Sequence, residues 1–360
     1  MEKAYLILED GHVFDGVSVG ARGEAVGEVV FTTAMVGYTE TLTDPSYCGQ
    51  LVTQTFPLIG NYGACAADAE SDRPYLSGYI VRELCDKGSN FRMDGELNDY
   101  LIRNGIVGIA GIDTRSLTRI LREAGVMNGV ITPYRVDIKK KLARAAAFRI
   151  EDAVGKTSSK QRRVVNKGGK YRVVLWDLGA KANIARELVS RGCEVIITPH
   201  SATAEQILAE KPDGLMLSNG GGDPADNVQI IAGLKKLLDS KLPTFGICLG
   251  HQLMALAMGA KTVKLKYGHR GANQPVRDAV TGRIYITSQN HGYAVAGGSL
   301  GSAVALMRFT NANDGTNEGI DYKNIPAFSV QFHPEACGGP LDTEFMFDRF
   351  IALMRGENNA

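Results

Sequence analysis

The chain has 360 residues, of which 44% are hydrophobic and 22% are charged. This length exceeds what one hydrophobic core usually organises, so it predicts two domains. The composition is that of soluble globular proteins and excludes disordered, collagen-like and membrane proteins. Forty basic and 39 acidic side chains leave a net charge of +1, so the chain lacks the positive field of nucleic-acid-binding proteins and we expect no nucleic-acid partner.

Neither the N-terminal residues nor the cysteines indicate export. The apolar run at residues 4–8 is too short for the core of a signal peptide, and nowhere do eighteen apolar residues follow one another, so we expect no membrane span. The six cysteines are scattered along the chain, which favours reduced thiols over a disulfide scaffold. We therefore predict a cytoplasmic protein.

Residues 1–151 are expected to form a mixed α and β domain. Short apolar runs alternate there with turn signals such as Thr43-Asp44-Pro45-Ser46, and one amphipathic helix is predicted over 114–124. The order of the strands does not follow from the pattern. Residues 152–170 are polar, basic and rich in glycine at one end, so we interpret them as a linker.

Residues 171–360 are expected to form an α/β domain with a doubly wound, mostly parallel sheet. Apolar strands alternate with short helices, which is typical of a parallel sheet covered on both faces. Since such sheets bind ligands at the carboxyl ends of their strands, the loops there are candidate sites. The predicted strands are 172–176, 195–198, 214–217, 243–247, 283–287 and 327–332, and the predicted helices are 184–191, 204–210, 228–238, 249–258 and 343–354.

A cysteine lies at the junction between the strand 243–247 and the helix 249–258. The pattern Gly-Ile-Cys-Leu-Gly at 246–250 is that of a nucleophile elbow, where a sharp turn exposes the reactive atom and small neighbours relieve crowding. The helix dipole is expected to lower the pKa of the Cys248 thiol, and the N–H of Leu249 would point toward a developing oxyanion. A buried structural cysteine needs no such glycines, so we interpret Cys248 as a nucleophile.

A cysteine nucleophile needs a histidine base, and His333 is the strongest candidate. It ends the strand 327–332, and the proline in His333-Pro334-Glu335 favours an extended backbone that places His333 and Glu335 on one face. Glu335 can then accept a hydrogen bond from the imidazole and fix its tautomer.

The other residues near the elbow receive different interpretations. His251 is interpreted as a surface or structural residue, whereas Gln252, four residues after Cys248, lies on the same helix face and its amide could contact a substrate. His269 and His291 are placed in glycine-containing turns and are given no chemistry.

The loop Ser-Asn-Gly-Gly-Gly-Asp-Pro at 218–224 follows the strand 214–217. Its backbone N–H groups could hold an anion, but no Gly-Lys-Ser/Thr follows, which disfavours a P-loop nucleotide site. An amide offered to an oxyanion near Cys248 fits the position better.

This chain carries SNGGGDP, GICLGHQ and QFHPE in this order, and together these motifs resemble those of the class I, triad-type glutamine amidotransferases. Over nearly its whole length the chain is also similar to the small, glutamine-hydrolysing subunits of carbamoyl-phosphate synthases. The N-terminal half is the discriminating part, because other amidotransferases of this class share only the second half. The segments that carry this similarity are TAMVGY at 33–38, TDPSY at 43–47, GNYG at 60–63, GIDTR at 111–115 and SQNHGY at 288–293.

The resemblance implies that Cys248 is the nucleophile, His333 the general base and acid, and Glu335 its orienting carboxylate. The residues that it implies for holding glutamine are Ser46 of the N-terminal domain and Gly220, Gly222, Leu249, Gln252, Asn290, Gly292 and Tyr293. Through a cysteinyl thioester, the chain would release glutamate and pass ammonia to a large subunit that makes carbamoyl phosphate from bicarbonate and ATP.

The resemblance also carries expectations about cofactors and context. We expect no cofactor or metal in this chain, with ATP and Mg on the partner subunit, and a heterodimer that serves arginine or pyrimidine biosynthesis. One position departs from the family pattern: Gly221 stands where the family usually has proline. The extra glycine is expected to loosen the loop, with a modest kinetic effect.

Three alternatives remain open. The chain could be the amidotransferase subunit of another synthase, of the anthranilate or guanylate type. Cys248-x-x-His251 and His333-x-x-x-Cys337 could form a zinc site, since they offer two thiols and two imidazoles at spacings that zinc accepts. A non-catalytic scaffold subunit is the third.

Overall fold

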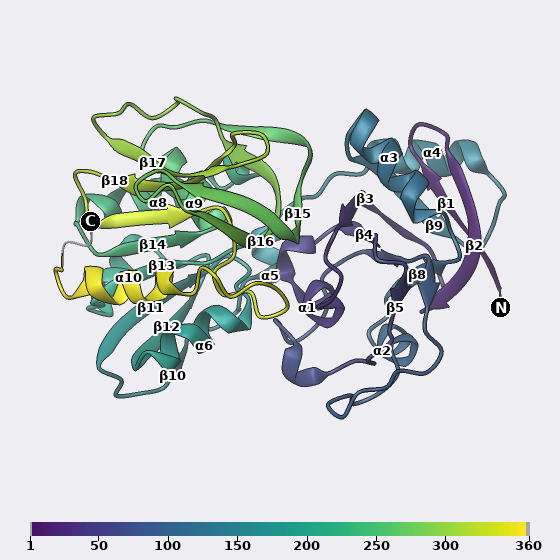
Figure 1. Ribbon diagram of the computed structural model, residues 1–360, viewed down its shortest axis with the longest axis horizontal. Coiled ribbons are helices and arrows are strands. Elements are labelled where there is room, and N and C mark those ends of the chain that lie inside the picture. The colour runs from purple at the N-terminus through teal and green to yellow at the C-terminus, as the bar shows by residue number, and fades with distance from the viewer. Residues whose placement is uncertain (1, 358–360) are drawn as a thin grey trace. The chain divides into compact units, whose positions relative to one another are not determined.

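The computed structural model describes residues 2–357, and the chain divides into two compact units between Ala153 and Val154 (Figure 1). All six cysteines are free thiols, as expected from their spacing. Among the described residues, none of the helices combines the length and the apolar composition needed to cross a membrane.

The first unit is built around a closed barrel with the strand order β1-β2-β8-β6-β4-β3-β9. The neighbours β3, β4, β6 and β8 run parallel, and the remaining pairs are antiparallel. The predicted mixed α and β character is confirmed. The barrel strands are β1 Lys3–Leu8, β2 Val13–Gly20, β3 Ala25–Thr32, β4 Gln50–Gln54, β6 Gly78–Ile80, β8 Val107–Ala110 and β9 Met127–Thr132.

Helices and short strands surround the barrel. The helix α3, Thr114–Ala124, has the bounds predicted from its amphipathic pattern, and Asp113 caps it by accepting a hydrogen bond from the Ser116 N–H at 3.0 Å. Leu117 and Leu121 are its fully buried residues with a spacing of four, as an amphipathic helix requires. The other elements are α1 Tyr38–Thr43, η1 Pro45–Tyr47, β5 Leu58–Ile59, η2 Ala66–Asp68, β7 Glu83–Leu84, α2 Leu97–Arg103 and α4 Ile138–Ala147.

The second unit contains one ten-stranded sheet, in the order β10-β12-β11-β13-β14-β19-β18-β17-β15-β16. The run from β12 to β19 is parallel, which confirms the doubly wound core expected from the sequence. The strands β18, β17, β15 and β16 extend it antiparallel, and most of this part was not predicted. The strands are β11 Tyr171–Asp177, β12 Cys193–Pro199, β13 Gly214–Leu217, β14 Thr244–Ile247, β15 Thr262–Asp278, β16 Ile284–Val295, β17 Ala305–Asn311, β18 Asn317–Tyr322 and β19 Ala327–Val330.

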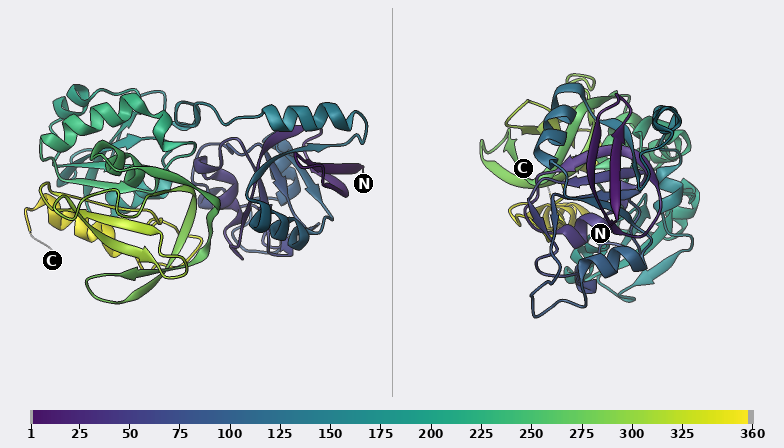
Figure 2. Two further views of the ribbon diagram at one scale, coloured as in Figure 1. Left: turned by 90° about the horizontal axis from the view of Figure 1, so that it is seen from above. Right: turned by 90° about the vertical axis from the view of Figure 1, so that its right-hand side faces the viewer.

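Helices cover both faces of the parallel strands. Along β11, Val174 and Trp176 point into a core formed with α8 and α9, while Val173 and Leu175 point into a second core formed with α6 and α10. Figure 2, left, shows α8 and α10 on opposite sides of the sheet. The helices are α6 Ala182–Ser190, α7 Ala204–Ala209, α8 Val228–Asp239, α9 Leu249–Ala257 and α10 Phe345–Met354, with the short η3 at Pro224–Asp226.

Residues 152–170 differ from the linker that their composition suggested. They contain α5, Ala153–Thr157, and the strand β10, Arg163–Val165, which pairs antiparallel with β12. The strand β10, with the sequence Arg-Val-Val, lies at the edge of the sheet and is largely exposed, so part of this segment belongs to the sheet and is not a linker. The second unit therefore begins at Val154 and includes most of this segment.

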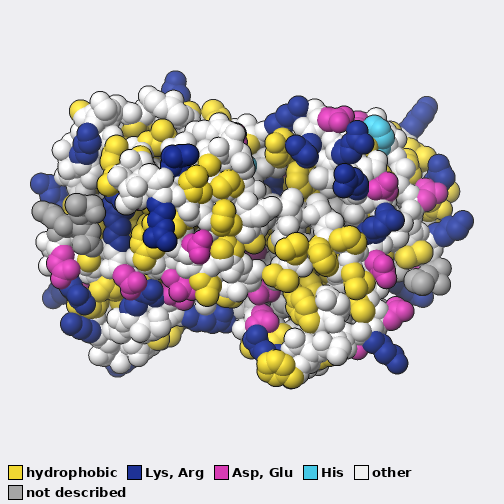
Figure 3. All heavy atoms as spheres, in the orientation of Figure 1, with side chains coloured by type: hydrophobic (Ala, Val, Ile, Leu, Met, Phe, Trp, Pro, Cys, Tyr) yellow, Lys and Arg dark blue, Asp and Glu magenta, His cyan; other side chains and the backbone are white. Residues whose placement is uncertain are grey.

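Basic and acidic side chains are interspersed over the face of the molecule that Figure 3 presents. This distribution agrees with the near balance of 40 basic and 39 acidic residues. The absence of a nucleic-acid partner stays a prediction.

Candidate active site

Cys248 occupies a sharp turn between β14 and α9. Its φ of 53° and ψ of −100° are values that residues other than glycine rarely adopt, as expected for a nucleophile elbow. The Cys248 N–H donates to the Val330 carbonyl at 2.8 Å, and the Gly250 N–H donates to the Ser218 carbonyl at 3.1 Å. These bonds tie the elbow to the ends of the neighbouring strands β19 and β13.

The two glycines that flank the elbow are required by close packing. A Cβ added at Gly246 would lie 2.8 Å from the backbone carbon of Gly250, and one added at Gly250 would lie 2.7 Å from the Leu217 carbonyl oxygen. Real Cβ atoms do not approach backbone this closely, so both positions exclude larger residues. The sequence-based reason for the glycines is thereby confirmed.

His333 and Glu335 form the hydrogen-bonded pair that was predicted. His333 Nδ1 lies 2.6 Å from Glu335 Oε1, and both side chains are almost completely buried. The His333 N–H donates to the Ser288 carbonyl at 2.9 Å, which anchors the segment to β16. His333 Nε2 is buried and makes no well-aligned hydrogen bond within residues 2–357, but the ring interacts with the Cys248 thiol through charge and hydrogen bonding.

The electrostatics favour a charged imidazolium. Burial and the Lys181 ammonium both lower the pKa of His333, but the Glu335 carboxylate and the Cys248 thiol outweigh them and raise it to about 10. Burial raises the pKa of Glu335, but His333 and Lys181 outweigh it and lower the pKa to about 2. An imidazolium beside a thiol stabilises the thiolate, which is the nucleophilic form of cysteine.

Lys181 is a member of this group that the sequence reasoning missed. Its Nζ lies 3.4 Å from Glu335 Oε1, and its side chain is 10% exposed. Its backbone N–H donates to Asn219 Oδ1 at 3.0 Å, which links the loops after β11 and β13. The sequence did contain a signal for a site residue at this position. Lys181 follows the carboxyl end of the predicted strand 172–176, and parallel sheets bind ligands at the carboxyl ends of their strands.

The glycine loop after β13 lies against the start of α9. A Cβ added at Gly220 would lie 2.3 Å from the Leu178 carbonyl oxygen and 2.7 Å from Leu249 Cδ2, so only glycine fits. Gly220 and Leu249 are therefore neighbours, as expected if both offer N–H groups to one oxyanion. Gly222 has a φ of 88°, a second position in this loop that favours glycine.

The strand β16 brings other predicted glutamine-binding residues beside the elbow. The Asn290 carbonyl lies 3.8 Å from the Cys248 sulfur, within hydrogen-bond reach of a thiol. The Gln252 amide nitrogen donates to the Tyr293 carbonyl at 2.8 Å, which joins α9 to β16. Gly292 lies between Asn290 and Tyr293 on the same strand. These four residues are thus grouped around Cys248, and their contacts with glutamine stay predictions.

Ser46 belongs to the first unit. It lies in η1 and is buried, and its N–H donates to Asp44 Oδ1 at 2.9 Å. Its role in glutamine binding remains a prediction.

The three other histidines of this unit that the sequence reasoning weighed are all buried. His251 is fully buried, and its Nδ1 lies 2.8 Å from the Ser329 hydroxyl. Burial lowers the pKa of His251 to about 3, so it is a neutral structural residue, and the alternative of a surface position was wrong. His269 and His291 lie in the strands β15 and β16, so their assignment to turns was also wrong.

The alternative zinc site is not assembled. Within residues 2–357, the group of histidine, cysteine and acidic side chains close enough to share a metal ion is His269, His291 and Glu318, and it contains none of the proposed ligands. Cys337 is exposed on the surface, whereas Cys248 and His251 are buried.

Comparisons with known proteins find families that match both units of the chain. Residues 6–131 match the family described as "Carbamoyl-phosphate synthase small chain, CPSase domain", and residues 174–353 match "Glutamine amidotransferase class-I". The carbamoyl phosphate synthase small chain of Syntrophotalea carbinolica is 48% identical over 98% of both chains. That of Bacillus anthracis is 51% identical over 98% of this chain and 96% of its own.

Among solved structures, a glutamine amidotransferase from Thermotoga maritima matches with a TM-score of 0.37 at 18% identity, over 46% of this chain and 76% of that chain. The small-chain relatives cover both units at about half identity, and the two family matches divide between the units. The chain therefore belongs to the carbamoyl-phosphate synthase small-chain family, and its second unit is a class I glutamine amidotransferase domain.

Proposed function

We propose that the second unit hydrolyses L-glutamine to glutamate and ammonia, and that a large partner subunit uses the ammonia to make carbamoyl phosphate. The observation that carries this proposal is the position of the His333 imidazole. Its Nδ1 lies 2.6 Å from Glu335 Oε1, and the same ring interacts with the thiol of Cys248 at the elbow. This geometry supports the proposed roles of Cys248 as nucleophile, His333 as base and Glu335 as orienting carboxylate.

In the first half of the reaction, the Cys248 thiolate attacks the carboxamide carbon of glutamine. The oxyanion that forms is stabilised by the N–H groups of Gly220 and Leu249. The carbon–nitrogen bond then breaks, and the His333 imidazolium donates its Nε2 proton to the departing ammonia. A glutamyl thioester on Cys248 remains.

In the second half, the now neutral His333 accepts a proton from water at Nε2, and the hydroxide attacks the thioester carbon. The carbon–sulfur bond breaks, glutamate leaves, and the thiolate is restored beside an imidazolium. Glu335 keeps its charge throughout and holds the proton on Nδ1, so that Nε2 alone exchanges protons with substrate.

The role of the ammonia rests on the first unit. Free ammonia is protonated in bulk water and lost as a nucleophile, so it is best used inside a complex. The match of residues 6–131 to the small-chain domain supports a heterodimer in which the partner is the large chain of a carbamoyl-phosphate synthase. It favours this partner over synthases of the anthranilate or guanylate type. That partner would bind ATP and Mg. The complex would act in the cytoplasm and supply carbamoyl phosphate for arginine or pyrimidine synthesis.

The glutaminase step is tested with Cys248→Ser, which is expected to abolish glutamate release. Cys85→Ser is the matched control, because a serine hydroxyl can replace the hydrogen bond from Cys85 Sγ to the Lys87 carbonyl at 3.2 Å. Hydrolysis by Cys248→Ser at the parent rate would show that Cys248 does no chemistry.

The partner is tested by co-purification from the native cells. A large ATP-dependent subunit of the carbamoyl-phosphate type is the expected companion, and the purified pair should convert glutamine, bicarbonate and ATP into carbamoyl phosphate. Recovery of a different synthase would reject the assignment.

A further inference from the structure

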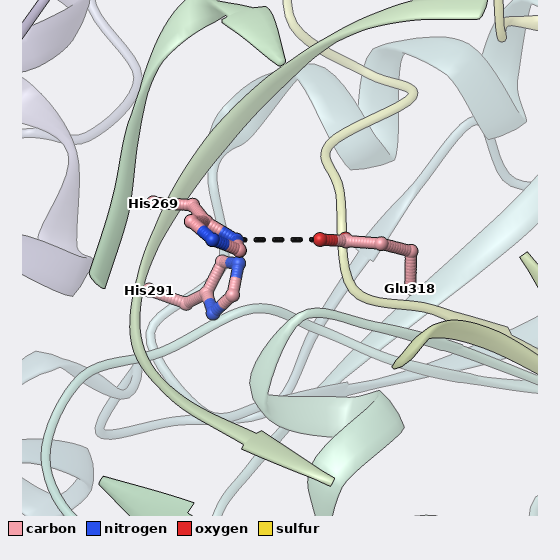
Figure 4. A group of neighbouring side chains, drawn as sticks. All are labelled: His269, His291 and Glu318. Atoms are coloured by element: carbon pink, nitrogen blue, oxygen red, sulfur yellow. Dashed lines mark ion pairs between the residues drawn. The ribbon is translucent and has the colours of Figure 1, made fainter. Parts of the chain in front are cut away.

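A second buried cluster of polar side chains lies on the antiparallel part of the sheet. It comprises His269 on β15, His291 on β16 and Glu318 on β18, and one ligand atom from each lies within 4.8 Å of the others (Figure 4). His269 and His291 are paired across the two strands, and the three residues are 8%, 5% and 0% exposed. The glutaminase mechanism uses none of them.

The first sign of a missing partner is at His269. Its Nε2 lies 2.8 Å from Asp314 Oδ2, which fixes a proton on that nitrogen. Its Nδ1 is buried and makes no well-aligned hydrogen bond among the described residues, and it lies 3.3 Å from Glu318 Oε1. With Nε2 protonated, the space between Nδ1 and the carboxylate must hold either a second proton, which makes the ring an imidazolium, or a metal cation that accepts the Nδ1 lone pair.

The second sign is at His291. Its Nδ1 lies 2.7 Å from the Tyr293 carbonyl and its Nε2 lies 3.0 Å from Gln289 Oε1, so both ring nitrogens face acceptors. The Gln289 amide is fixed in this orientation, because its nitrogen donates to Thr287 Oγ1 at 3.1 Å and to Glu318 Oε2 at 3.0 Å. A neutral imidazole can donate only once. One ring nitrogen therefore faces an acceptor with no hydrogen between them, and when Nδ1 donates to the closer Tyr293 carbonyl, that nitrogen is Nε2.

Contrary to the expectation from the sequence that this chain holds no metal, we propose that this cluster binds a divalent cation of the zinc class. The ligands are His269 Nδ1, His291 Nε2 and Glu318 Oε1, and Gln289 Oε1 completes the set. Two imidazoles and one carboxylate are ligands that zinc prefers, and tetrahedral zinc at about 2.0–2.1 Å from each places its ligand atoms roughly 3.3 Å apart. The observed separation of 3.3 Å between Nδ1 and Oε1 already fits.

The surroundings hold each ligand as established metal sites do. Asp314 holds the outer nitrogen of His269, and the Tyr293 carbonyl holds the outer nitrogen of His291. Asn311 donates to Glu318 Oε1 at 3.1 Å, and Gln289 donates to the other oxygen, so the carboxylate is oriented from both sides. Carboxylates and carbonyls on the outer nitrogens fix the tautomer that offers a lone pair to the metal.

The cation would tie β15, β16 and β18 together next to the active site. Asn290, whose carbonyl contacts the Cys248 sulfur, directly precedes His291 on β16. The rival occupant is a proton, with His269 charged between the two carboxylates. Metal analysis separates these occupants, and its outcome does not depend on whether the chain hydrolyses glutamine.

The first experiment uses the full chain, stripped with a chelator and titrated with Zn²⁺ against a chromophoric competitor. We expect one equivalent to bind tightly, and X-ray absorption to show nitrogen and oxygen ligands at about 2.0–2.1 Å with no sulfur shell at about 2.3 Å. Failure to bind zinc would assign the cluster to the proton. A sulfur ligand would place the metal at a cysteine, and either result would overturn the proposal.

The second experiment compares variants. Glu318→Gln, which keeps the shape of the side chain but removes its charge, should abolish stoichiometric binding. Asp314→Asn should weaken zinc binding by about 10- to 100-fold. Because the Asp314 side chain is 47% exposed, this variant tests the site even if Glu318→Gln, at a buried position, does not fold. His12→Ala removes an exposed histidine paired with Asp10 and should leave binding unchanged. Parent-like zinc affinity in Asp314→Asn and in folded Glu318→Gln would refute the proposal.

Discussion

Replacing Glu335 by glutamine isolates the contribution of its charge to catalysis. Glutamine has the same shape and can still accept the hydrogen bond from His333 Nδ1, which lies 2.6 Å from Glu335 Oε1. The tautomer is therefore retained, while the buried negative charge that raises the pKa of His333 is lost. We expect the pKa of His333 to fall, which makes the imidazolium that serves the reaction less stable.

The size of the effect follows from the burial and length of this contact. Hydrogen bonds to charged groups contribute about 1.5–3 kcal/mol, and this one is short and fully enclosed. If that energy stabilises the imidazolium during ammonia release, kcat/KM should fall by about 10- to 150-fold. The change also removes the carboxylate that lies 3.4 Å from Lys181 Nζ. Combining Glu335→Gln with Lys181→Met restores the charge balance and controls for a general loss of stability.

The assay is glutamate release at pH 7, together with the rate at which iodoacetamide alkylates Cys248. Both rates should fall in Glu335→Gln, and the double variant should recover thermal stability without recovering the rates. If a folded Glu335→Gln protein hydrolysed glutamine within twofold of the parent, the charge of Glu335 would have no catalytic role and the reasoning above would be refuted.

Three further predictions concern stability. The pair of His333, with its pKa raised to about 10, and Glu335, with its pKa lowered to about 2, should stabilise the fold most between about pH 4.5 and 6.5. The difference in melting temperature between the parent and His333→Asn should therefore shrink as the pH rises toward 10 or falls toward 2, and a constant difference would contradict the assignment. Gly250→Ala should lower the free energy of unfolding by about 1–3 kcal/mol and remove most of the activity, because the added Cβ would clash with the backbone of β13. Gly297→Ala is the control: nothing lies within 4 Å of the added Cβ, so stability and activity should not change. Calorimetry compares the stability of the two variants. His251→Asn should lower stability by about 1–3 kcal/mol, since the buried ring contacts the Ser329 hydroxyl of β19. Because the mechanism gives His251 no role, kcat/KM should stay within about fivefold, and a larger loss would assign His251 to the chemistry.

The parallel core and the catalytic group could be predicted because their signals are local. Apolar residues dominate each core strand. The elbow glycines and the His-Pro-Glu segment lie within a few residues of the side chains that they position. The helix at 114–124 was predicted in both bounds for the same reason. Lys181 was missed because its partner Glu335 lies 154 residues further along the chain.

The antiparallel strands were assigned wrongly because glycine occurs both in turns and at irregular positions inside strands. His269 and His291 were assigned to glycine-containing turns, but Gly268 and Gly271, on either side of His269, lie inside β15, with φ values of 71° and 146°, where the pairing with β16 shifts register. Such irregularities bend a strand without ending it. His269, which lies between these glycines, was consequently assigned to a turn, and the buried cluster with His291 and Glu318 could not be foreseen.

The closed barrel of the first unit has a consequence for biosynthesis. The strand β1 pairs with β9, whose residues lie more than 120 positions later, so the ring cannot close until almost the whole unit has left the ribosome. Until then, β1 and β3 each expose an unsatisfied edge to other nascent chains. Deleting Lys3–Leu8 would make that exposure permanent, on β2 and β9, and would turn a self-contained ring into an open sheet prone to aggregate.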